Sequence, residues 1–156
     1  MSSATLLVVD DDRQIAEFLN DLLRQFGHRV VNAYRGQEAL DALASPEAGG
    51  VDLVLLDVLL PDMSGTEVCQ RIKSSPITSH VPVIMVTGLD RPADKTRGLE
   101  LGADDYVTKP FDPKELAARV GAMLRLRRAE RELRARNRAL AALNAEIGRA
   151  SCRERV

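Results

Sequence analysis

The fold of this chain is decided by the stretch Thr5-Leu6-Leu7-Val8-Val9-Asp10-Asp11-Asp12, in which an apolar run ends abruptly in three carboxylates. A continuous apolar run of this length is typical of a strand that is buried on both faces of a parallel sheet. Apolar residues then recur at helical spacing over residues 13–26, and Gly27 can end that helix in a left-handed conformation. The chain therefore opens with a buried strand followed by an amphipathic helix.

The same alternation of strand and helix continues along the chain. We expect further strands over residues 28–33, 52–56, 82–86 and 106–108, and helices over residues 37–44, 64–73, 90–101 and from 113 onward. Ser64 and Glu67 have the spacing of a capping box, and Asp12 and Asp112 are placed to cap two other helices. Five such alternations predict an α/β fold, a doubly wound (βα)5 sandwich with a parallel sheet in the order 2-1-3-4-5.

Composition excludes several classes of protein. Of the 156 residues, 45% are hydrophobic and 29% are charged, a balance typical of a globular chain. No apolar run approaches the length of about 20 residues that a membrane span needs, and we find no secretory signal, so we expect a cytoplasmic protein that does not bind membranes. Cys69 and Cys152 provide neither a disulfide framework nor a metal ligand set.

Polar side chains follow four of the predicted strands, at the sheet edge where open parallel sheets bind ligands. They are Asp10–Asp12, Asp57, Thr87 and Lys109. Clustered carboxylates repel one another, and a hard divalent cation such as Mg²⁺ relieves that repulsion. A carboxylate can also attack phosphorus, while a Lys ammonium neutralises phosphoryl oxygens. Taken singly, each residue is equally typical of a turn, a helix cap or a solvated surface, but their joint placement favours phosphoryl chemistry.

Four motifs resemble the receiver domain of bacterial two-component response regulators, over roughly residues 4–127. They are LLVVDDD at residues 6–12, LLDVLLPDMSG at 55–65, VIMVTG at 83–88 and GADDYVTKPF at 102–111. The resemblance implies a flavodoxin-like signalling protein that accepts a phosphoryl group from a sensor histidine kinase or a phosphotransfer protein, with Mg²⁺ or alternatively Mn²⁺. The resemblance implies a signalling protein and not a metabolic enzyme, because a receiver domain catalyses only its own phosphorylation and dephosphorylation.

The resemblance also implies a role for individual residues of the metal site. Asp57 would accept the phosphoryl group. Asp11 and Asp57 would bind the metal directly, together with the backbone carbonyl of Leu59, whereas Asp10 would hold a metal-bound water.

Three further residues would respond to phosphorylation in a protein of this family. Lys109 would pair with Asp57 before transfer and with the phosphoryl group afterwards, and we expect a cis peptide bond before Pro110. Thr87 would bind a phosphoryl oxygen and move inward, while Tyr106 would switch between outward and inward rotamers; the bland alternative for Tyr106 is a plain core position.

Two sets of positions are individual to this chain. Leu59 and Leu89 would flank the acyl phosphate and give an attacking water no polar anchor, so we predict slow spontaneous loss of the phosphoryl group.

Similar proteins dimerise through their fourth helix, fifth strand and fifth helix. The charged residues of this chain at matching positions are Lys95, Asp105, Glu115 and Arg119.

The last predicted helix continues past residue 124 as a long C-terminal helical extension. Leu126, Leu133, Leu140 and Ile147 recur every seven residues, and Ala129, Arg136 and Leu143 follow three positions later. This is a partial heptad, interrupted by Arg136, which predicts a homodimeric coiled coil, with an extended solvated helix as the alternative.

Residues 1–118 hold 11 basic and 19 acidic residues, a net charge of −8, and residues 119–156 hold 11 and 4, a net charge of +7. Without aromatic residues or a DNA-binding motif, we do not expect nucleic acid as a partner.

We therefore expect a receiver domain over residues 1–127, a helical extension over 128–145 and a non-native tail over 146–156. That tail resembles a translated sequencing adapter, and Gly148 should interrupt the helix there. Two other functions stay open. An aspartate-nucleophile, Mg-dependent phosphohydrolase is disfavoured because Leu59 stands where such enzymes carry an acid/base Asp. A non-phosphorylated, receiver-like coiled-coil adaptor is disfavoured because the acidic, Thr and Lys set is complete.

Overall fold

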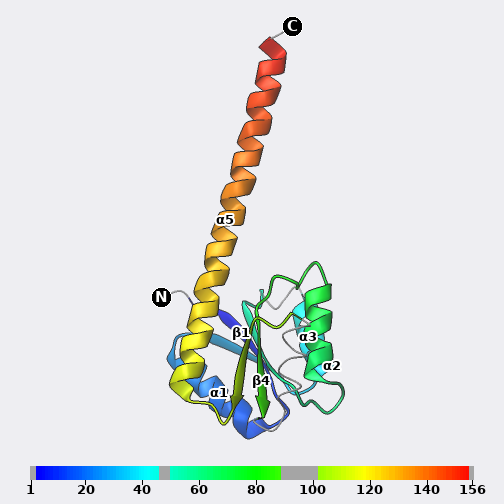
Figure 1. Cartoon of the computed structure of the whole chain (residues 1–156), viewed down its shortest axis with the longest axis vertical. Helices are drawn as coiled ribbons and strands as arrows, with labels where there is room; N and C mark the ends of the chain where they lie inside the picture. Colours follow the sequence, from blue (N-terminus) through cyan, green and yellow to red (C-terminus); the bar gives the residue numbers. More distant parts are fainter. Residues whose placement is uncertain (1–2, 46–49, 89–101, 155–156) are drawn as a thin grey trace. The chain divides into compact units, whose positions relative to one another are not determined.

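The computed structural model of the chain describes residues 3–45, 50–88 and 102–154. It divides into two compact units, Met1–Leu124 and Arg125–Val156. The first unit contains a sheet with its covering helices, and the second is formed by the continuation of the last helix (Figure 1). A separate origin for residues 146–156 stays a prediction.

A parallel sheet forms the centre of the first unit. Its strands are β1 (Thr5–Val9), β2 (Arg29–Ala33), β3 (Leu53–Asp57), β4 (Val83–Gly88) and β5 (Asp105–Lys109). Their spatial order is β2-β1-β3-β4-β5, and all four pairings are parallel, which confirms the predicted doubly wound sheet. β3 is buried along its whole length because neighbouring strands flank it and helices cover both faces of the sheet.

The helices cover the two faces of the sheet in pairs. They are α1 (Arg13–Gln25), α2 (Gly36–Ala44), α3 (Gly65–Ser74) and α5 (Pro113–Glu154). On one face, Leu7 and Val9 of β1 belong to the cluster that α2 and α3 cover, whereas the alternate residues Leu6 and Val8 belong to the cluster with α1 and the start of α5. Figure 1 shows α2 and α3 side by side on their face. The helix predicted over residues 90–101 lies outside the described residues.

Ser64 caps α3, as predicted, by accepting a hydrogen bond from the Thr66 N–H at 3.2 Å, and the Glu67 carboxylate pairs with Arg71 at 2.9 Å. One local expectation of the sequence is wrong. Gly148 does not interrupt α5, which is continuous from Pro113 to Glu154. A glycine costs a helix only about 1 kcal/mol relative to alanine, and the surrounding run of Ala, Arg and Glu favours the helix by more than that.

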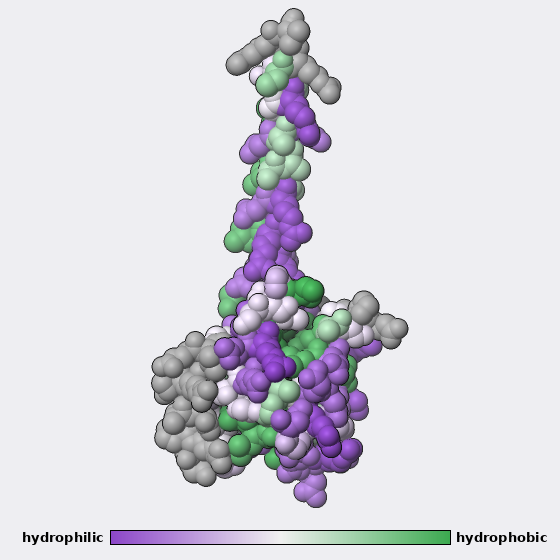
Figure 2. All heavy atoms as spheres, turned by 90° about the vertical axis from the view of Figure 1, so that its right-hand side faces the viewer, coloured by the Kyte–Doolittle hydropathy of each residue, from purple (hydrophilic) through white to green (hydrophobic). Residues whose placement is uncertain are grey.

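The second unit carries apolar side chains at intervals among polar ones, as Figure 2 shows. All its residues from Arg128 to Cys152 are exposed. Among the residues described, none of the helices combines the length and the hydropathy that crossing a membrane requires.

Candidate functional site

Three carboxylates meet at the carboxyl edge of the sheet. Asp10 and Asp11 directly follow β1, and Asp57 is the last residue of the neighbouring strand β3. One oxygen of each carboxylate lies within 4.8 Å of the others. Asp10 and Asp57 are only 3% and 8% exposed, whereas Asp11 is exposed. This set of hard oxygen donors with one open side fits Mg²⁺, which combines a few carboxylates with several waters.

Lys109, the last residue of β5, places an ammonium between two of these carboxylates. Its Nζ donates to Asp10 Oδ2 and to Asp57 Oδ2, at 3.2 Å in both cases. Burial lowers the pKa of Lys109, but the nearby charges of Asp57 and Asp10 outweigh that effect and raise it. The bond between Lys109 and Pro110 is cis. The site therefore holds a permanently charged ammonium that is shared between two anions.

Hydrogen bonds to both of its carboxylate oxygens hold Asp10 in place. Its Oδ1 accepts a hydrogen bond from the Asp12 N–H at 2.9 Å, while its Oδ2 faces Lys109. Burial is the main effect that raises the pKa of Asp10, and the Asp57 charge acts in the same direction against the lowering by Asp12 and Lys109. A cation among the carboxylates would favour the ionised form of Asp10. Asp12 itself caps α1, as predicted, by accepting from the N–H groups of Gln14 and Ile15.

The loop after Asp57 is closed tightly at its base. The Gly65 N–H donates to the Val58 carbonyl at 2.7 Å, and a Cβ at Gly65 would overlap the backbone oxygen of Asp57. Only glycine fits against the backbone there. Within the loop, the Leu59 N–H donates to Asp57 Oδ1 at 3.2 Å. The position of the Asp57 carboxylate and that of the loop backbone are therefore fixed together.

Asp62 fixes the outer end of the same loop, a role that the sequence analysis missed. Its carboxylate accepts hydrogen bonds from the N–H groups of Gly36 at 2.8 Å and Gln37 at 2.9 Å, the first two residues of α2. These bonds lower the pKa of Asp62. Arg35, the N-cap residue of α2, supplies no side-chain cap. The poor capping residue at the start of α2 is the signal that could have pointed to a cap from elsewhere.

Thr87 and Tyr106 lie on the neighbouring strands β4 and β5. Thr87 is 1% exposed, and its hydroxyl donates to the Gly88 carbonyl at 3.3 Å. It lies one residue beyond Val86, which pairs with Asp57 in the sheet. Tyr106 is buried in the cluster that α2 and α3 cover. Thr87 thus reaches the edge where the carboxylates gather, and Tyr106 occupies an inward position.

Three of the four predicted dimer-face charges are described, and these three are paired within the chain. The Arg119 guanidinium donates to both Asp105 oxygens at 2.9 and 3.0 Å, and to Glu115 at 3.0 and 3.2 Å. Lys95 lies outside the described residues, as does Leu89. Leu59 is described, and its side chain is 53% exposed beside the carboxylates.

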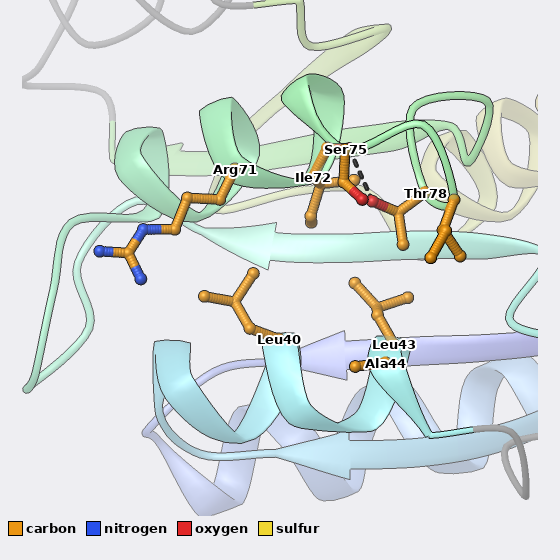
Figure 3. A pocket seen from close by; sticks show the side chains of 8 residues that line it. Leu40, Leu43, Ala44, Arg71, Ile72, Ser75 and Thr78 are labelled. Carbon is orange, nitrogen blue, oxygen red and sulfur yellow. Dashed lines mark hydrogen bonds between the residues drawn. The ribbon is translucent and has the colours of Figure 1, made fainter.

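A second concave region lies between α2 and α3 and has a different character. Figure 3 shows Leu40 and Leu43 of α2 facing Ile72, Ser75 and Thr78 across it. Among the described residues, no carboxylate lines this hollow, and the one charged side chain that does, Arg71, is already paired with Glu67. The chemistry of the chain is therefore concentrated at the sheet edge.

Comparisons with known proteins identify the family of this chain. A sequence model of the response regulator receiver domain matches residues 6–121. The sensory transduction protein RegX3 of Mycolicibacterium smegmatis is 49% identical over 121 residues, which are 78% of this chain and 50% of that protein. The chain thus spans about half the length of the curated relatives it matches.

Solved structures give the same result. The CheY-like receiver domain protein from Methanospirillum hungatei is 30% identical with a TM-score of 0.75, over 83% of this chain and 99% of that one. The receiver domain of the Francisella response regulator 1452 is 32% identical with a TM-score of 0.71, over 78% and 97%. With its parallel sheet, its carboxylate cluster and these relatives, the chain belongs to the response regulator receiver domain family of two-component signalling.

Proposed function

We propose that Asp57 accepts a phosphoryl group from a phosphohistidine of a sensor histidine kinase or a phosphotransfer protein. The observation that carries this proposal is the Lys109 ammonium, 3.2 Å from both Asp57 and Asp10 beside the open carboxylate of Asp11. An Asp57 oxygen attacks phosphorus, an O–P bond forms and the P–N bond breaks. The electron pair of that bond stays on the histidine nitrogen. The imidazole leaves neutral where its other nitrogen was protonated, and otherwise it takes up a proton from water.

Some of the residues around Asp57 would bind Mg²⁺, and others would neutralise the charge of the phosphoryl oxygens. Asp11, Asp57 and the Leu59 carbonyl would hold Mg²⁺, with Asp10 reaching it through water. The ion would neutralise phosphoryl oxygens as charge builds on them. Lys109 balances the carboxylates before transfer and follows the phosphoryl oxygens afterwards, because its ammonium is already shared between two acceptors. The Leu59 N–H orients one Asp57 oxygen.

The added charge of about −2 supplies the switch. The Thr87 hydroxyl leaves the Gly88 carbonyl and donates to a phosphoryl oxygen. The end of β4 moves with it, and β5 follows, because Thr87 is paired with Thr108 in the sheet. The surface of the fourth helix, β5 and the start of α5 would then bind an output partner or a second copy. Of the described residues, Arg119 and Asp105 contribute an ion pair to that surface.

Intact-mass spectrometry after treatment with acetyl phosphate and Mg²⁺ tests the assignment of Asp57. We expect a mass increase of one phosphoryl group, which is absent in Asp57→Asn and in the presence of a chelator. A matched control is Asp52→Asn, which removes the carboxylate of the residue before β3, at the opposite end of that strand from Asp57. An adduct of equal yield in Asp57→Asn contradicts the proposal.

The exposed Leu59 side chain argues against a phosphohydrolase. It stands two residues after Asp57 and offers neither a proton nor a hydrogen bond to an attacking water. We therefore expect the phosphoryl group to be lost slowly, and Leu59→Asn to accelerate its loss. The adduct's decay, followed by intact mass after acetyl phosphate is removed, measures both rates; equal decay in the two proteins would contradict this expectation.

A further inference from the structure

The second unit exposes a regular row of large apolar side chains. Leu126, Leu133, Leu140 and Ile147 recur every seven residues along α5 and are 54, 60, 57 and 59% exposed, and Leu143 is 52% exposed. Figure 2 shows these apolar patches separated by polar side chains along the helix. A regular series of exposed apolar side chains along an otherwise charged helix indicates a site of protein–protein contact.

The spacing of this row fits one kind of partner. With the four residues at position a of a heptad, Ala129, Arg136 and Leu143 fall at position d. Positions a and d lie along one side of a helix, whereas most arginines of the unit fall at positions b, c and f, on the other side. A period of seven, instead of multiples of 3.6, is that of helices wound around each other in a left-handed supercoil.

We propose that the second unit pairs with the same unit of a second copy of this chain, as a parallel, in-register, two-stranded coiled coil. In such a pair, position g of one helix lies beside position e of the other helix, five residues further on. Arg125 then lies beside Glu130 of the partner subunit, which joins opposite charges. An antiparallel pair centred on Ala139 would instead place Glu132 opposite Glu146 of the partner subunit and, in that register, would join no opposite charges at positions e and g.

Arg136 supplies the specificity of this pair. It is the one charged residue at the a and d positions from Leu126 to Leu143. In register, both copies of Arg136 share one layer, and each has Glu132 four residues earlier in the favourable order for an ion pair. A shift of one heptad would put each Arg136 into an apolar layer of the other helix, which costs more than one shared layer. The shared Arg136 layer therefore weakens the dimer but selects its register.

The charge of the unit predicts how salt affects the dimer. Residues 125–145 hold seven Arg and two Glu, so two parallel helices repel each other. Salt screens that repulsion, and the dissociation constant should fall as ionic strength rises. A dimer held mainly by ion pairs would respond in the opposite direction.

Sedimentation velocity of the unphosphorylated full chain over a range of concentrations tests the pairing. We expect a reversible dimer whose dissociation constant rises at least about tenfold in Leu140→Lys and falls about tenfold in Arg136→Leu. Ala142→Lys is the matched control, because it adds the same charge at position c and should change the constant little. A monomer at all concentrations, or a dimer indifferent to Leu140→Lys, overturns the proposal.

Disulfide formation tests the orientation in a Cys152→Ser background. Ala129→Cys at position d should cross-link two copies in a glutathione buffer, because parallel d positions face each other at a distance a disulfide can span. Ala135→Cys at position c should not. A dimer in which the Ala129→Cys protein fails to cross-link, or in which both positions cross-link equally, overturns the parallel register. Circular dichroism confirms that each variant is folded, and because no phosphorylation is involved, failure here leaves the proposed role of Asp57 intact.

Discussion

The first unit buries β3 completely, whereas the second unit exposes all its large apolar residues between Leu126 and Ile147. In the first unit, packing on both faces of the sheet fixes the strand ends and therefore the positions of Asp10, Asp57 and Lys109. In the second unit, the helix is specified by local propensity and by its heptad pattern. One unit therefore contains its own site, and the other needs a second surface to bury its apolar side chains.

The same substitution should have opposite effects in the two units. Gly65→Ala places a Cβ against the backbone of Asp57 and Val58, which cannot move away cheaply, so we expect a loss of about 3 kcal/mol in the free energy of unfolding. Gly148→Ala meets nothing within 4 Å and should stabilise the helix by about 0.5–1 kcal/mol. Urea denaturation followed by circular dichroism measures both. Equal stability of the two variants would show that the loop does not pack as described.

Removing the shared ammonium should affect chemistry more than folding. In Lys109→Gln, the phosphoryl oxygens lose their nearest fixed positive charge, and we expect the rate of phosphorylation by acetyl phosphate to fall about 10²-fold. Lys114→Gln removes an exposed ammonium of α5 and serves as the control. The rate is measured by intact mass at intervals, and a rate in Lys109→Gln equal to that of the control would refute this role.

The Asp62 cap should appear as an acid-dependent loss of stability. Hydrogen bonds from Gln37 and Gly36 lower the pKa of Asp62 in the folded chain, so its contribution is complete above about pH 4 and is lost as pH falls through the lower, folded-state pKa. Asp62→Asn should reduce Tm slightly at pH 7 and flatten the dependence of Tm on pH in that acidic range. Because the same loop carries Leu59, the variant should also weaken Mn²⁺ binding in an electron paramagnetic resonance titration. Parallel pH profiles for the two proteins would contradict the cap.

The smallest effect is expected at the charged surface of β5 and α5. Arg119 and Asp105 are partly exposed, and a pair of this kind contributes about 0–1 kcal/mol. A double-mutant cycle with Arg119→Gln and Asp105→Asn, measured by urea denaturation, gives the coupling energy. A coupling well above that range would mean that the pair is an organising feature of the first unit.

Much of the fold and of the site followed from local sequence patterns. Buried strands are continuous apolar runs in the sequence. The polar residues that end these runs meet at one edge because the register of a parallel sheet aligns the strand ends. The roles of the individual site residues came from a resemblance to a family and stay predictions here; the residues are Asp10, Asp11, Asp57, Leu59, Thr87, Tyr106 and Lys109. The Asp62 cap was not predictable, because it joins residues 26 positions apart and depends on the tertiary approach of α2 to the loop. The helix break predicted at Gly148 does not occur, because the cost of a glycine to a helix is small beside the helix propensity of its neighbours.

The contrast between the two units extends to their thiols. Cys69 is a fully buried residue of α3, and burial raises the pKa of its thiol to about 11, so almost none of it is the reactive thiolate at neutral pH. Cys152 is exposed on the second unit. A maleimide dye added to the native chain should therefore attach to the helix and spare the domain. Energy transfer between two such dyes would report on assembly of the helix without perturbing the phosphoacceptor.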